Sequence, residues 1–296
     1  MRVLILGASG MLGHKLCQVF PERFETWGTI RRGLPCWFNA SILDGTRAIL
    51  GVDATAFDSV AGAIATAQPG VVVNAIGIVK QQPTARDPIS SLAVNSYFPR
   101  RLSSFCRASG VRLIHFSTDC VFSGRRGAYT EDDSPDPEDL YGWSKLLGEL
   151  DSPTCLTLRT SMVGRELGTT VGLLEWFLAN QGGRVKGYTH AIFSGFPTLV
   201  LARIVADVIE HHPRLSGTYH VSSVPISKYD LLCLFRAAYR MRVEIDPSSE
   251  VRRDRSLVST RFQTATGFAP PLWTDLVGQL AADPTPYDEW RHQHAA

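Results

Sequence analysis

The first twenty residues constrain the fold more than any other part of the chain. An apolar run at residues 2–6 is typical of a short β-strand, a glycine-rich stretch follows at once, and residues 14–20 predict a helix that ends at Pro21. This order suits a dinucleotide pyrophosphate, because glycines let the backbone approach the phosphates and a helix N-terminus offers free N–H groups. The spacing is G-x-x-G-x-x-G instead of the standard G-x-G-x-x-G, and a tight turn without a ligand is the alternative. The residues that we assign to the cofactor here are Gly7, Ser9, Gly10, Met11, Leu12 and Gly13.

The end of the second expected strand bears on the kind of dinucleotide. Residues 24–30 fit a strand, and Arg31 and Arg32 follow it. NAD sites usually place an acidic residue here to bind the ribose 2′-hydroxyl, whereas two guanidinium groups can bind a 2′-phosphate. We therefore predict NADP(H) in preference to NAD(H), with a solvated basic turn as the alternative.

Three more stretches are expected to border the same site. Residues 51–54 are expected to close a third strand beside the adenine, although an aspartate in a loop needs no ligand. Residues 70–77 predict a buried strand that ends in small side chains, against which a cofactor can lie, and the amide of Asn74 can tie neighbouring strands together. Asn95 interrupts a helical pattern, which indicates either a functional hydrogen bond or a satisfied core amide. The residues that we assign to the cofactor from these stretches are Asp53, Ala54, Asn74, Ala75, Ile76, Gly77 and Asn95.

A strand and a helix further along the chain carry the candidate catalytic groups. Residues 111–116 predict a fifth strand that delivers Ser117 and Thr118 to the carboxyl edge of the sheet, where a hydroxyl can donate a hydrogen bond to a substrate carbonyl. Tyr141 and Lys145 lie four residues apart, so a helix would put the phenol and the ammonium on one face. A nearby ammonium favours the phenolate and makes the phenol a usable proton donor and acceptor. Together the hydroxyl, phenol and ammonium predict the reduction of a carbonyl.

These segments resemble the extended, nucleotide-sugar-modifying branch of the short-chain dehydrogenase/reductase superfamily. Within that branch the resemblance is closest to the dTDP-4-dehydrorhamnose reductases, and it covers residues 1–165 well and the remainder loosely. The motifs that carry it are the glycine turn, residues 74–77, 117–124, 141–145 and 156–164.

The resemblance implies an NADPH-dependent reduction of a 4-keto or other keto carbon in a nucleotide-linked deoxysugar, within cell-surface polysaccharide biosynthesis. Tyr141 would give its proton to the developing alkoxide and Thr118 would orient the carbonyl. Lys145 would lower the pKa of the phenol and hold the nicotinamide ribose. Ser117, Tyr141 and Lys145 would also contact the cofactor.

The implied substrate contacts include two departures from the family. Cys120 stands where the rhamnose reductases usually have tyrosine, and Met162 stands where they usually have an aromatic residue. Both positions are expected to border the sugar, so the hexose and its nucleotide stay open. The substrate-binding residues that we assign are Thr118, Asp119, Cys120 and Met162.

Composition and charge narrow the class of protein. Of 296 residues, 44% are hydrophobic, and 30 basic against 28 acidic side chains give a net charge of +2, so bulk charge suggests neither nucleic acid nor a membrane surface as a partner. No apolar run approaches the ~20 residues that span a bilayer, and the N-terminus enters a strand directly, so we expect a cytoplasmic protein. The expected partner is a small-molecule nucleotide sugar, and a homodimer is among the assemblies that the sequence allows.

Six cysteines lack a C-x-x-C pair or a histidine cluster, so we expect reduced thiols and no metal site: Cys17, Cys36, Cys106, Cys120, Cys155 and Cys233.

Strands alternate with helices through Ser161, which predicts an α/β fold with a doubly wound parallel sheet of the Rossmann type. We expect a dinucleotide-binding domain at residues 1–165 and a smaller, mainly substrate-binding lobe at 166–296, with a strand near 217–223 returning to the sheet. The loop at 123–140 is expected either to close over the substrate or to be a solvated surface loop. The lobe residues that are candidates for binding a nucleotide diphosphate, with solvated surface side chains as the alternative, are Arg184, Lys186, Arg252, Arg253 and Arg255.

Two other functions stay open. A nucleotide-sugar epimerase or dehydratase on the same scaffold would retain its dinucleotide and return the hydride. Dehydratases of this branch usually carry Asp-Glu after the threonine, whereas Asp119 is followed by Cys120, and Arg31 and Arg32 contradict the acidic residue usual in epimerases. A non-catalytic NADP-binding subunit, like the regulatory subunit of methionine adenosyltransferase, is the third possibility.

Overall fold

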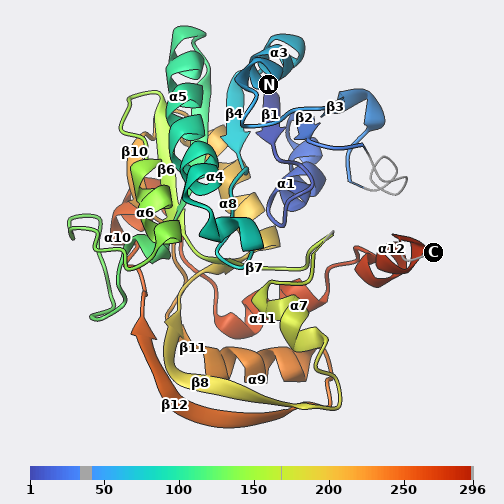
Figure 1. Cartoon of the computed structure of the whole chain (residues 1–296), viewed down its shortest axis with the longest axis vertical. Coiled ribbons are helices and arrows are strands. Elements are labelled where there is room, and N and C mark those ends of the chain that lie inside the picture. The colour runs from blue at the N-terminus through green and yellow to red at the C-terminus, as the bar shows by residue number, and fades with distance from the viewer. Residues whose placement is uncertain (34–41, 168, 295–296) are drawn as a thin grey trace.

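A seven-stranded parallel sheet forms the larger part of the molecule (Figure 1). The computed structural model describes residues 1–33, 42–167 and 169–294. The strand order is β10-β6-β5-β4-β1-β2-β3, which changes direction between β1 and β4, where doubly wound folds bind ligands. The predicted fold class is therefore confirmed. The strands are β1 (Arg2–Leu6), β2 (Glu25–Ile30), β3 (Ala48–Leu50), β4 (Val71–Asn74), β5 (Arg112–Thr118), β6 (Cys155–Thr160) and β10 (Gly217–His220).

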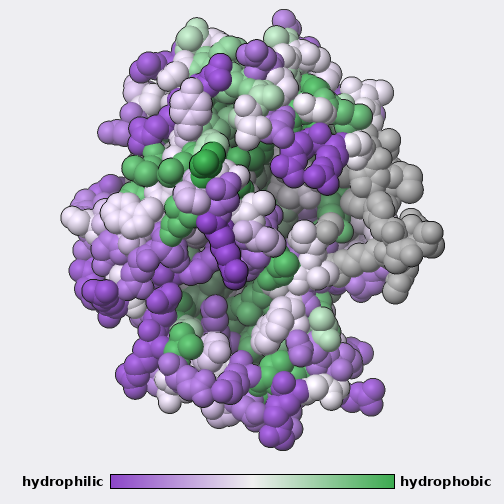
Figure 2. Space-filling view, viewed as in Figure 1, coloured by the Kyte–Doolittle hydropathy of each residue, from purple (hydrophilic) through white to green (hydrophobic). Residues whose placement is uncertain are grey.

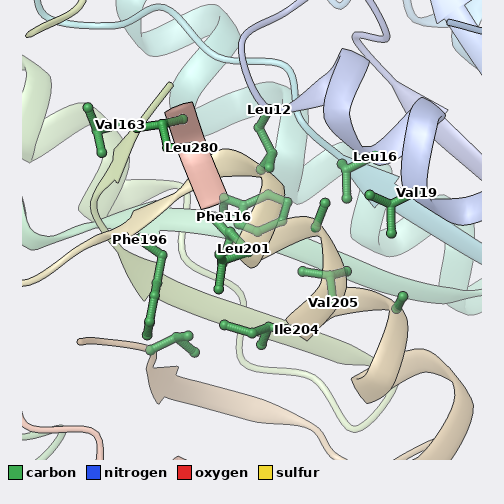
Figure 3. Close-up of a cluster of buried hydrophobic side chains, with 14 of the residues drawn as sticks. Leu12, Leu16, Val19, Phe116, Val163, Phe196, Leu201, Ile204, Val205 and Leu280 are labelled. Carbon is green, nitrogen blue, oxygen red and sulfur yellow. The ribbon is translucent and has the colours of Figure 1, made fainter. Parts of the chain in front are cut away.

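The inner strands of this sheet are buried on both faces. In β1, Val3 and Ile5 face one apolar core, whereas Leu4 and Leu6 face the other, as the period of two along a strand requires. Helices α1 (Gly13–Val19) and α8 (Thr198–His211) cover the first core, and Figure 3 shows their labelled leucine, isoleucine and valine side chains beside Phe116 of β5. The second core is covered by α3 (Phe57–Ala67) and α5 (Phe98–Ala108).

A chain of short helices connects α5 to the carboxyl edge of the sheet. The π-helical turn η4 (Ala93–Tyr97) joins α4 (Pro88–Leu92) to α5, and α6 (Leu140–Leu147) packs beside η4. The remaining short turns of this part are η1 (Phe20–Glu22), η2 (Gly45–Arg47), η3 (Pro83–Arg86) and η5 (Asp119–Val121).

The second part of the molecule is a smaller lobe below the sheet in Figure 1. It contains a three-stranded sheet of order β11-β8-β12, in which β11 is antiparallel and β12 is parallel to β8, with α9 packed against β8. Its elements are α7 (Leu173–Leu178), β8 (Arg184–Phe193), β11 (Ile226–Ser227), α9 (Lys228–Ala238), β12 (Glu244–Asp254) and α11 (Trp273–Ala281), and the two-stranded link of β7 (Met162–Val163) with β9 (Phe196–Pro197) joins it to the sheet. Two further helices, α10 (Thr260–Thr266) and α12 (Tyr287–His294), pack on the larger part, α10 beside β10 and α12 beside α1.

Most expected elements have the expected type, and one strand lies elsewhere. The strand predicted near 217–223 does return to the sheet, as β10 beside β6. The third strand was expected to close at 51–54, which is wrong, because β3 ends at Leu50 and Gly51 turns the chain with a φ of 74°. Within the described residues, no helix is long and apolar enough to cross a membrane.

Candidate active site

The glycine turn is as tight as the sequence predicted. Gly7 has a φ of 86°, and a Cβ atom added to Gly13 would lie 2.0 Å from the carbonyl oxygen of Gly7. Only glycine lets α1 approach β1 this closely. Ser9 and Gly10 are exposed, although the Gly10 N–H donates to the Gly7 carbonyl within the turn at 3.0 Å. The side chain of Leu12 belongs to the first core, so only its backbone can border a ligand.

Two basic side chains follow β2, next to the turn. Arg31 and Arg32 are both exposed, and β2 lies beside β1 in the sheet. The pKa of Asp53 lies below its usual value because of hydrogen bonds from Thr55, and the charge of Arg31 adds to this shift. The carboxylate of Asp53 accepts from the backbone N–H and the hydroxyl of Thr55 at 2.8 and 2.7 Å, so one of its oxygens serves the local turn, beside the partly buried Ala54.

The loop after β4 closes the other side of the glycine turn. Asn74 binds His115 of β5 at 3.1 Å and accepts from the backbone N–H of Ile76 at 3.1 Å, so it ties two strands together as predicted. A Cβ atom added to Gly7 would lie 3.0 Å from the side chain of Ile76, and the backbone of Ala75 is almost as close. The two loops therefore touch.

Asn95 fixes the same loop to the helix that carries Tyr141 and Lys145. Its amide oxygen accepts from Ile78 N–H at 2.9 Å, while its amide nitrogen donates to Ile78 C=O at 3.0 Å and to the Ser144 hydroxyl at 3.1 Å. It lies in the π-helical turn η4, a type of distortion common at functional sites. Asn95 is thus a fully bonded amide that positions two site elements.

Tyr141 and Lys145 lie one turn apart on α6, as predicted. The helix begins after Asp139, whose carboxylate accepts from Gly142 N–H at 2.8 Å and pairs with Lys80. The Lys145 ammonium donates to Phe116 C=O of β5 at 2.6 Å. A Cβ atom added to Gly77 would lie 4.0 Å from that ammonium. Lys145 therefore faces the space between the ends of β4 and β5.

The protonation of this pair differs from the expectation. Burial lowers the pKa of Lys145 to about 8, and the charge of Glu149 opposes the shift. Burial, together with Cys120, raises the pKa of the Tyr141 phenol, while a hydrogen bond with Thr118 opposes this. We expected Lys145 to lower the phenol pKa, but its ammonium is directed to the Phe116 carbonyl, and desolvation of the phenol dominates. Tyr141 is accordingly in its proton-donating form at neutral pH.

Residues 118–120 place polar groups beside Tyr141. The Thr118 hydroxyl donates to Asp119 at 3.1 Å and accepts from Cys120 N–H at 3.1 Å. Burial raises the pKa of Asp119, while the charge of Arg255 opposes this, and burial also raises the pKa of the Cys120 thiol to about 12. Met162, the fourth predicted substrate contact, is half-buried in β7 and packs against the first core.

Ser117 does not face the same way as Thr118. Its hydroxyl donates to Glu149 at 2.6 Å, and Glu149 forms a nearly buried ion pair with Arg159 at 2.7 Å. Neighbouring residues of a strand point to opposite faces, so only one of the two hydroxyls can serve the reacting edge. In this structure that hydroxyl is Thr118.

Among the basic residues predicted for the diphosphate, Arg255 differs from the others. Arg184 and Lys186 pair with Glu244 and Glu250 on the exposed outer sheet of the lobe. Arg252 and Arg253 are exposed as well, and Arg253 pairs with Glu138.

Arg255 is only 8% exposed and lies beside Thr118 and its neighbours. It donates to Phe122 C=O at 2.8 Å and to the Cys120 sulfur at 3.2 Å, while its Nη2 has no hydrogen-bond partner among the described residues.

Sequence reasoning missed Lys228, the first residue of α9. Burial lowers its pKa, and the charge of Asp119 opposes this, which places Lys228 beside Asp119. Lys228 follows Ser227, whose hydroxyl caps α9 by accepting from Asp230 N–H at 3.0 Å.

The loop at 123–140 is anchored along much of its length. Tyr129 exchanges backbone hydrogen bonds with Ser256 and Val258, and the Glu131 carboxylate accepts from His220 N–H of β10 at 2.8 Å. It is therefore neither a free lid nor a merely solvated loop here.

The cysteines that the structure describes are free thiols, and Cys36 lies outside the described residues.

Comparisons with known proteins agree with this geometry. Residues 1–283 match the RmlD substrate binding domain family. The chain is 35% identical to dTDP-4-dehydrorhamnose reductase of Streptomyces griseus over 149 residues, which are 50% of this chain and only 43% of that protein. It is 28% identical to methionine adenosyltransferase 2 subunit beta of Danio rerio over 81% of this chain and 74% of that protein. The fold matches the crystal structure of dTDP-4-dehydrorhamnose reductase from Bacillus anthracis in complex with NADP, with a TM-score of 0.78 and 22% identity over 96% of this chain and 99% of that one.

Proposed function

Since the chain belongs to the RmlD substrate binding domain family, within the extended short-chain dehydrogenases/reductases, we propose that it is an NADPH-dependent reductase of a nucleotide-linked keto-deoxysugar. The observation that carries the proposal is the meeting of three groups at one edge of the sheet. Tyr141 is a neutral phenol bonded to Thr118, and the Lys145 ammonium lies between the ends of β4 and β5.

A dinucleotide fits the residues present. Gly7 and Gly13 let α1 begin directly against the end of β1, and the exposed residues Ser9 and Gly10 leave the outer side of this turn open to a pyrophosphate. Arg31 and Arg32 would bind a 2′-phosphate, which supports NADPH over NADH. When bound, the nicotinamide supplies the hydride.

The reaction that these residues support is proton-assisted reduction of a ketone. Thr118 orients the carbonyl oxygen through its hydroxyl. Tyr141 gives its proton to that oxygen as negative charge develops there, so the carbonyl becomes an alcohol and the phenol becomes a phenolate. The Lys145 ammonium, which donates to the Phe116 carbonyl at the end of β5, would bind the ribose next to the nicotinamide.

Two basic side chains lie near Asp119 and Cys120, where we expect the sugar, and their positive charge supports an anionic, nucleotide-linked substrate. Arg255 has a buried guanidinium nitrogen without a hydrogen-bond partner among the described residues, and Lys228 lies close to the same Asp119 carboxylate. A buried donor left unpaired costs free energy, which a phosphate oxygen would recover. Of the five basic residues that we predicted for the diphosphate we therefore retain Arg255, and we add Lys228.

A non-catalytic NADP-binding subunit is the second candidate, because the similarity to methionine adenosyltransferase 2 subunit beta extends over most of the chain. An epimerase or dehydratase is less consistent with the site, since Cys120 is a neutral thiol and supplies no second acid next to Asp119.

The homodimer and the cytoplasmic location stay predictions. Figure 2 shows hydrophobic residues on the face that carries α4, where Ile89 is 80% exposed, and this face is a candidate for the contact between two copies of the chain. Sedimentation velocity would measure whether the chain is a dimer.

The deciding experiment incubates the purified chain with a panel of nucleotide-linked 4-keto sugars and NADPH, and follows the absorbance of the reduced cofactor. Stoichiometric oxidation of NADPH by one of these sugars is the expected result. NADPH binding without turnover on any of them would favour the regulatory subunit. Tightly retained NAD⁺ that is regenerated in each turnover would favour the epimerase.

A further inference from the structure

Near the end of the described residues, the segment Asp283–Trp290 lies across the helix that follows the glycine turn. We call this segment the C-terminal strap. It contributes Tyr287 and Trp290 to the first core, next to α1. The match to the family ends at residue 283, so nearly all of the strap lies beyond the family's shared part.

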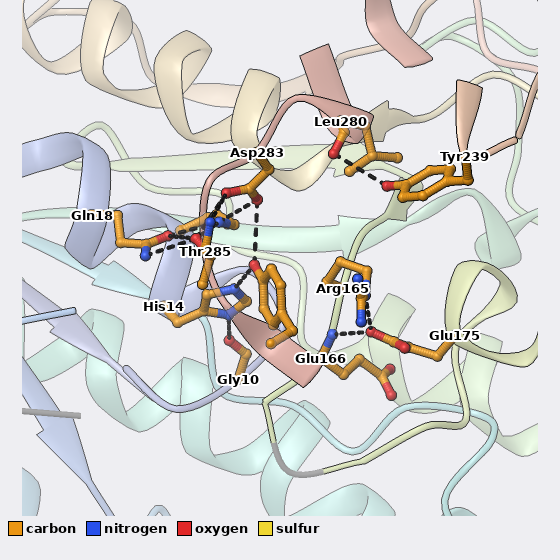
Figure 4. A network of polar contacts seen from close by, with 12 residues as sticks. Gly10, His14, Gln18, Arg165, Glu166, Glu175, Tyr239, Leu280, Asp283 and Thr285 are labelled. Carbon is orange, nitrogen blue, oxygen red and sulfur yellow. Dashed lines mark hydrogen bonds and ion pairs between the residues drawn. The ribbon is translucent and has the colours of Figure 1, made fainter. Parts of the chain in front are cut away.

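His14 connects the strap to the glycine turn itself. Its Nδ1 is 2.9 Å from the carbonyl oxygen of Gly10, and its Nε2 is 2.7 Å from the Tyr287 hydroxyl. A carbonyl can only accept, so Nδ1 carries the proton, Nε2 accepts, and Tyr287 donates over this shorter contact, while its hydroxyl lies 3.4 Å from an Asp283 oxygen as a second acceptor. Burial and the charge of Lys15 lower the pKa of His14 to about 3, so this neutral tautomer persists at physiological pH. Figure 4 shows His14 directed at Gly10 from the strap side of the helix.

A buried ion pair fixes the beginning of the strap on α1. The Lys15 ammonium lies 2.5 Å from the Asp283 carboxylate, and their side chains are 2% and 5% exposed. Lys15 also donates to Gln18 at 2.7 Å and to the Thr285 hydroxyl at 2.9 Å. With these partners the ammonium has three acceptors, which is all that it can use. The pair thus holds the strap in a single register on α1.

The other end of the strap reaches the substrate lobe. Arg165 pairs with Asp288 of the strap at 2.5 Å and with Glu175 of α7 at 2.8 Å, and its guanidinium lies 4.9 Å from the centre of the Tyr287 ring. The lobe comes close to the turn here, because a Cβ atom added to Gly172 would lie 4.0 Å from the Met11 sulfur. One segment therefore contacts the cofactor turn, through His14, and the lobe, through Arg165.

We propose that the C-terminal strap positions the glycine turn for the dinucleotide, with Tyr287 and His14 as positioning residues that hold the Gly10 carbonyl. This inference rests on the proposed function, because it assigns the turn to NADPH. Ordering the turn before binding reduces the entropy lost when the cofactor binds. By linkage, NADPH must strengthen the docking of the strap by the same factor by which the docked strap strengthens NADPH binding.

The test compares two tyrosines that each lose one hydroxyl. Tyr287→Phe removes the donor to His14, and Tyr239→Phe is the matched control, because its hydroxyl donates to Leu280 C=O at 3.1 Å, away from the turn. We expect Tyr287→Phe to raise the Kd of NADPH about fivefold, while kcat at saturating NADPH changes little and Tyr239→Phe changes neither. Hydrogen exchange in the unmodified chain is the second readout, and we expect slower exchange at residues 283–290 when NADPH is added.

Four outcomes separate this inference from the proposed function. A selective increase in the Kd of Tyr287→Phe, with NADPH-dependent protection of the strap, supports both. Unchanged Kd and unchanged exchange in the strap overturn the inference and leave the reductase assignment standing. Equal increases in the Kd of both variants mean a general loss of stability, which also overturns it. A chain that does not bind NADPH at all overturns the proposed function, and the inference with it.

Discussion

The side chain that bears most directly on the proposed chemistry is Tyr141. Replacing it with phenylalanine removes one hydroxyl and leaves the glycine turn, Arg31 and Arg32 untouched. We expect Tyr141→Phe to lower kcat by about 10²- to 10⁴-fold, the usual contribution of a general acid, and to leave the Kd of NADPH nearly unchanged. Steady-state kinetics and equilibrium binding measure the two quantities. Tyr97→Phe, on an exposed phenol, is the control, and normal turnover by Tyr141→Phe would refute the catalytic assignment.

Lys145 makes the pH dependence of the reaction predictable. Burial lowers its pKa to about 8, so its ammonium is lost as the pH rises through 8 and not near the ordinary value of ~10.4. If the ammonium is needed, kcat/KM for NADPH should be level below pH 8 and fall about tenfold per pH unit above it, because this parameter reports groups of the free enzyme. The raised pKa of Tyr141 keeps the phenol from titrating in the same range.

A variant that retains the positive charge tests whether Lys145, and not another group, causes the decline in kcat/KM above pH 8. Lys145→Arg keeps its charge to above pH 12, so the decline above pH 8 should vanish in whatever activity the variant retains. A decline that begins at pH 8 in both proteins would assign it to another group.

Spacing along the chain identified the residues whose partners are local. The four-residue interval of Tyr141 and Lys145, and the position of Asn74 at a strand end, are visible in the sequence. Lys228 was missed, and Arg255 was not separated from the four other basic residues predicted with it, because these two reach Asp119 and Cys120 from more than a hundred positions away. The period of two along a strand could have excluded the Ser117 hydroxyl, since it shows that Ser117 and Thr118 cannot face the same way.

At the scale of elements, a glycine near each end of α6 lets this helix pack directly against the backbone of neighbouring segments. A Cβ atom added to Gly142 would lie 2.3 Å from the carbonyl oxygen of Cys120, and one added to Gly148 would lie 1.9 Å from that of Asn95. These contacts set how closely α6 approaches Thr118 and the turn η4. The sequence did not indicate them, because each partner lies far from its glycine along the chain.

We therefore expect Gly142→Ala to move α6 and to disturb catalysis. The new methyl group would overlap backbone, so the helix must shift, at a cost of about 1–3 kcal/mol in the free energy of unfolding and with a fall in kcat. Gly62→Ala in α3 is the matched control, since nothing lies within 4 Å of the new Cβ, and it should stabilise the chain by about 0.5–1 kcal/mol. Denaturant unfolding and kcat report both effects, and wild-type values in Gly142→Ala would contradict this account of the helix.

For the molecule as a whole, the boundary that we expected at residue 165 does not coincide with a division of the large sheet and its core. β10 completes the sheet beside β6, and α8 covers the first core beside α1, although both follow the start of the lobe in sequence. Arg112 of β5 also donates to carbonyl groups at the end of α8, including His212 C=O at 3.0 Å. The sequence predicted the return of a strand to the sheet, but only the packing shows that the sheet needs α8 as well.

A fragment of residues 1–165 should therefore not fold by itself. It lacks the buried aliphatic side chains of α8, which are Val200, Leu201, Ile204, Val205, Val208 and Ile209. At about 1.5–3 kcal/mol each their burial contributes about 10 kcal/mol or more, comparable to the whole stability of a typical domain. We expect the fragment to bind a hydrophobic dye and to lack a cooperative thermal transition, and the full chain to unfold in one transition whose calorimetric and van't Hoff enthalpies agree. A cooperative transition in the fragment would show that the sheet is stable without α8, and that residues 166–296 are a separable domain.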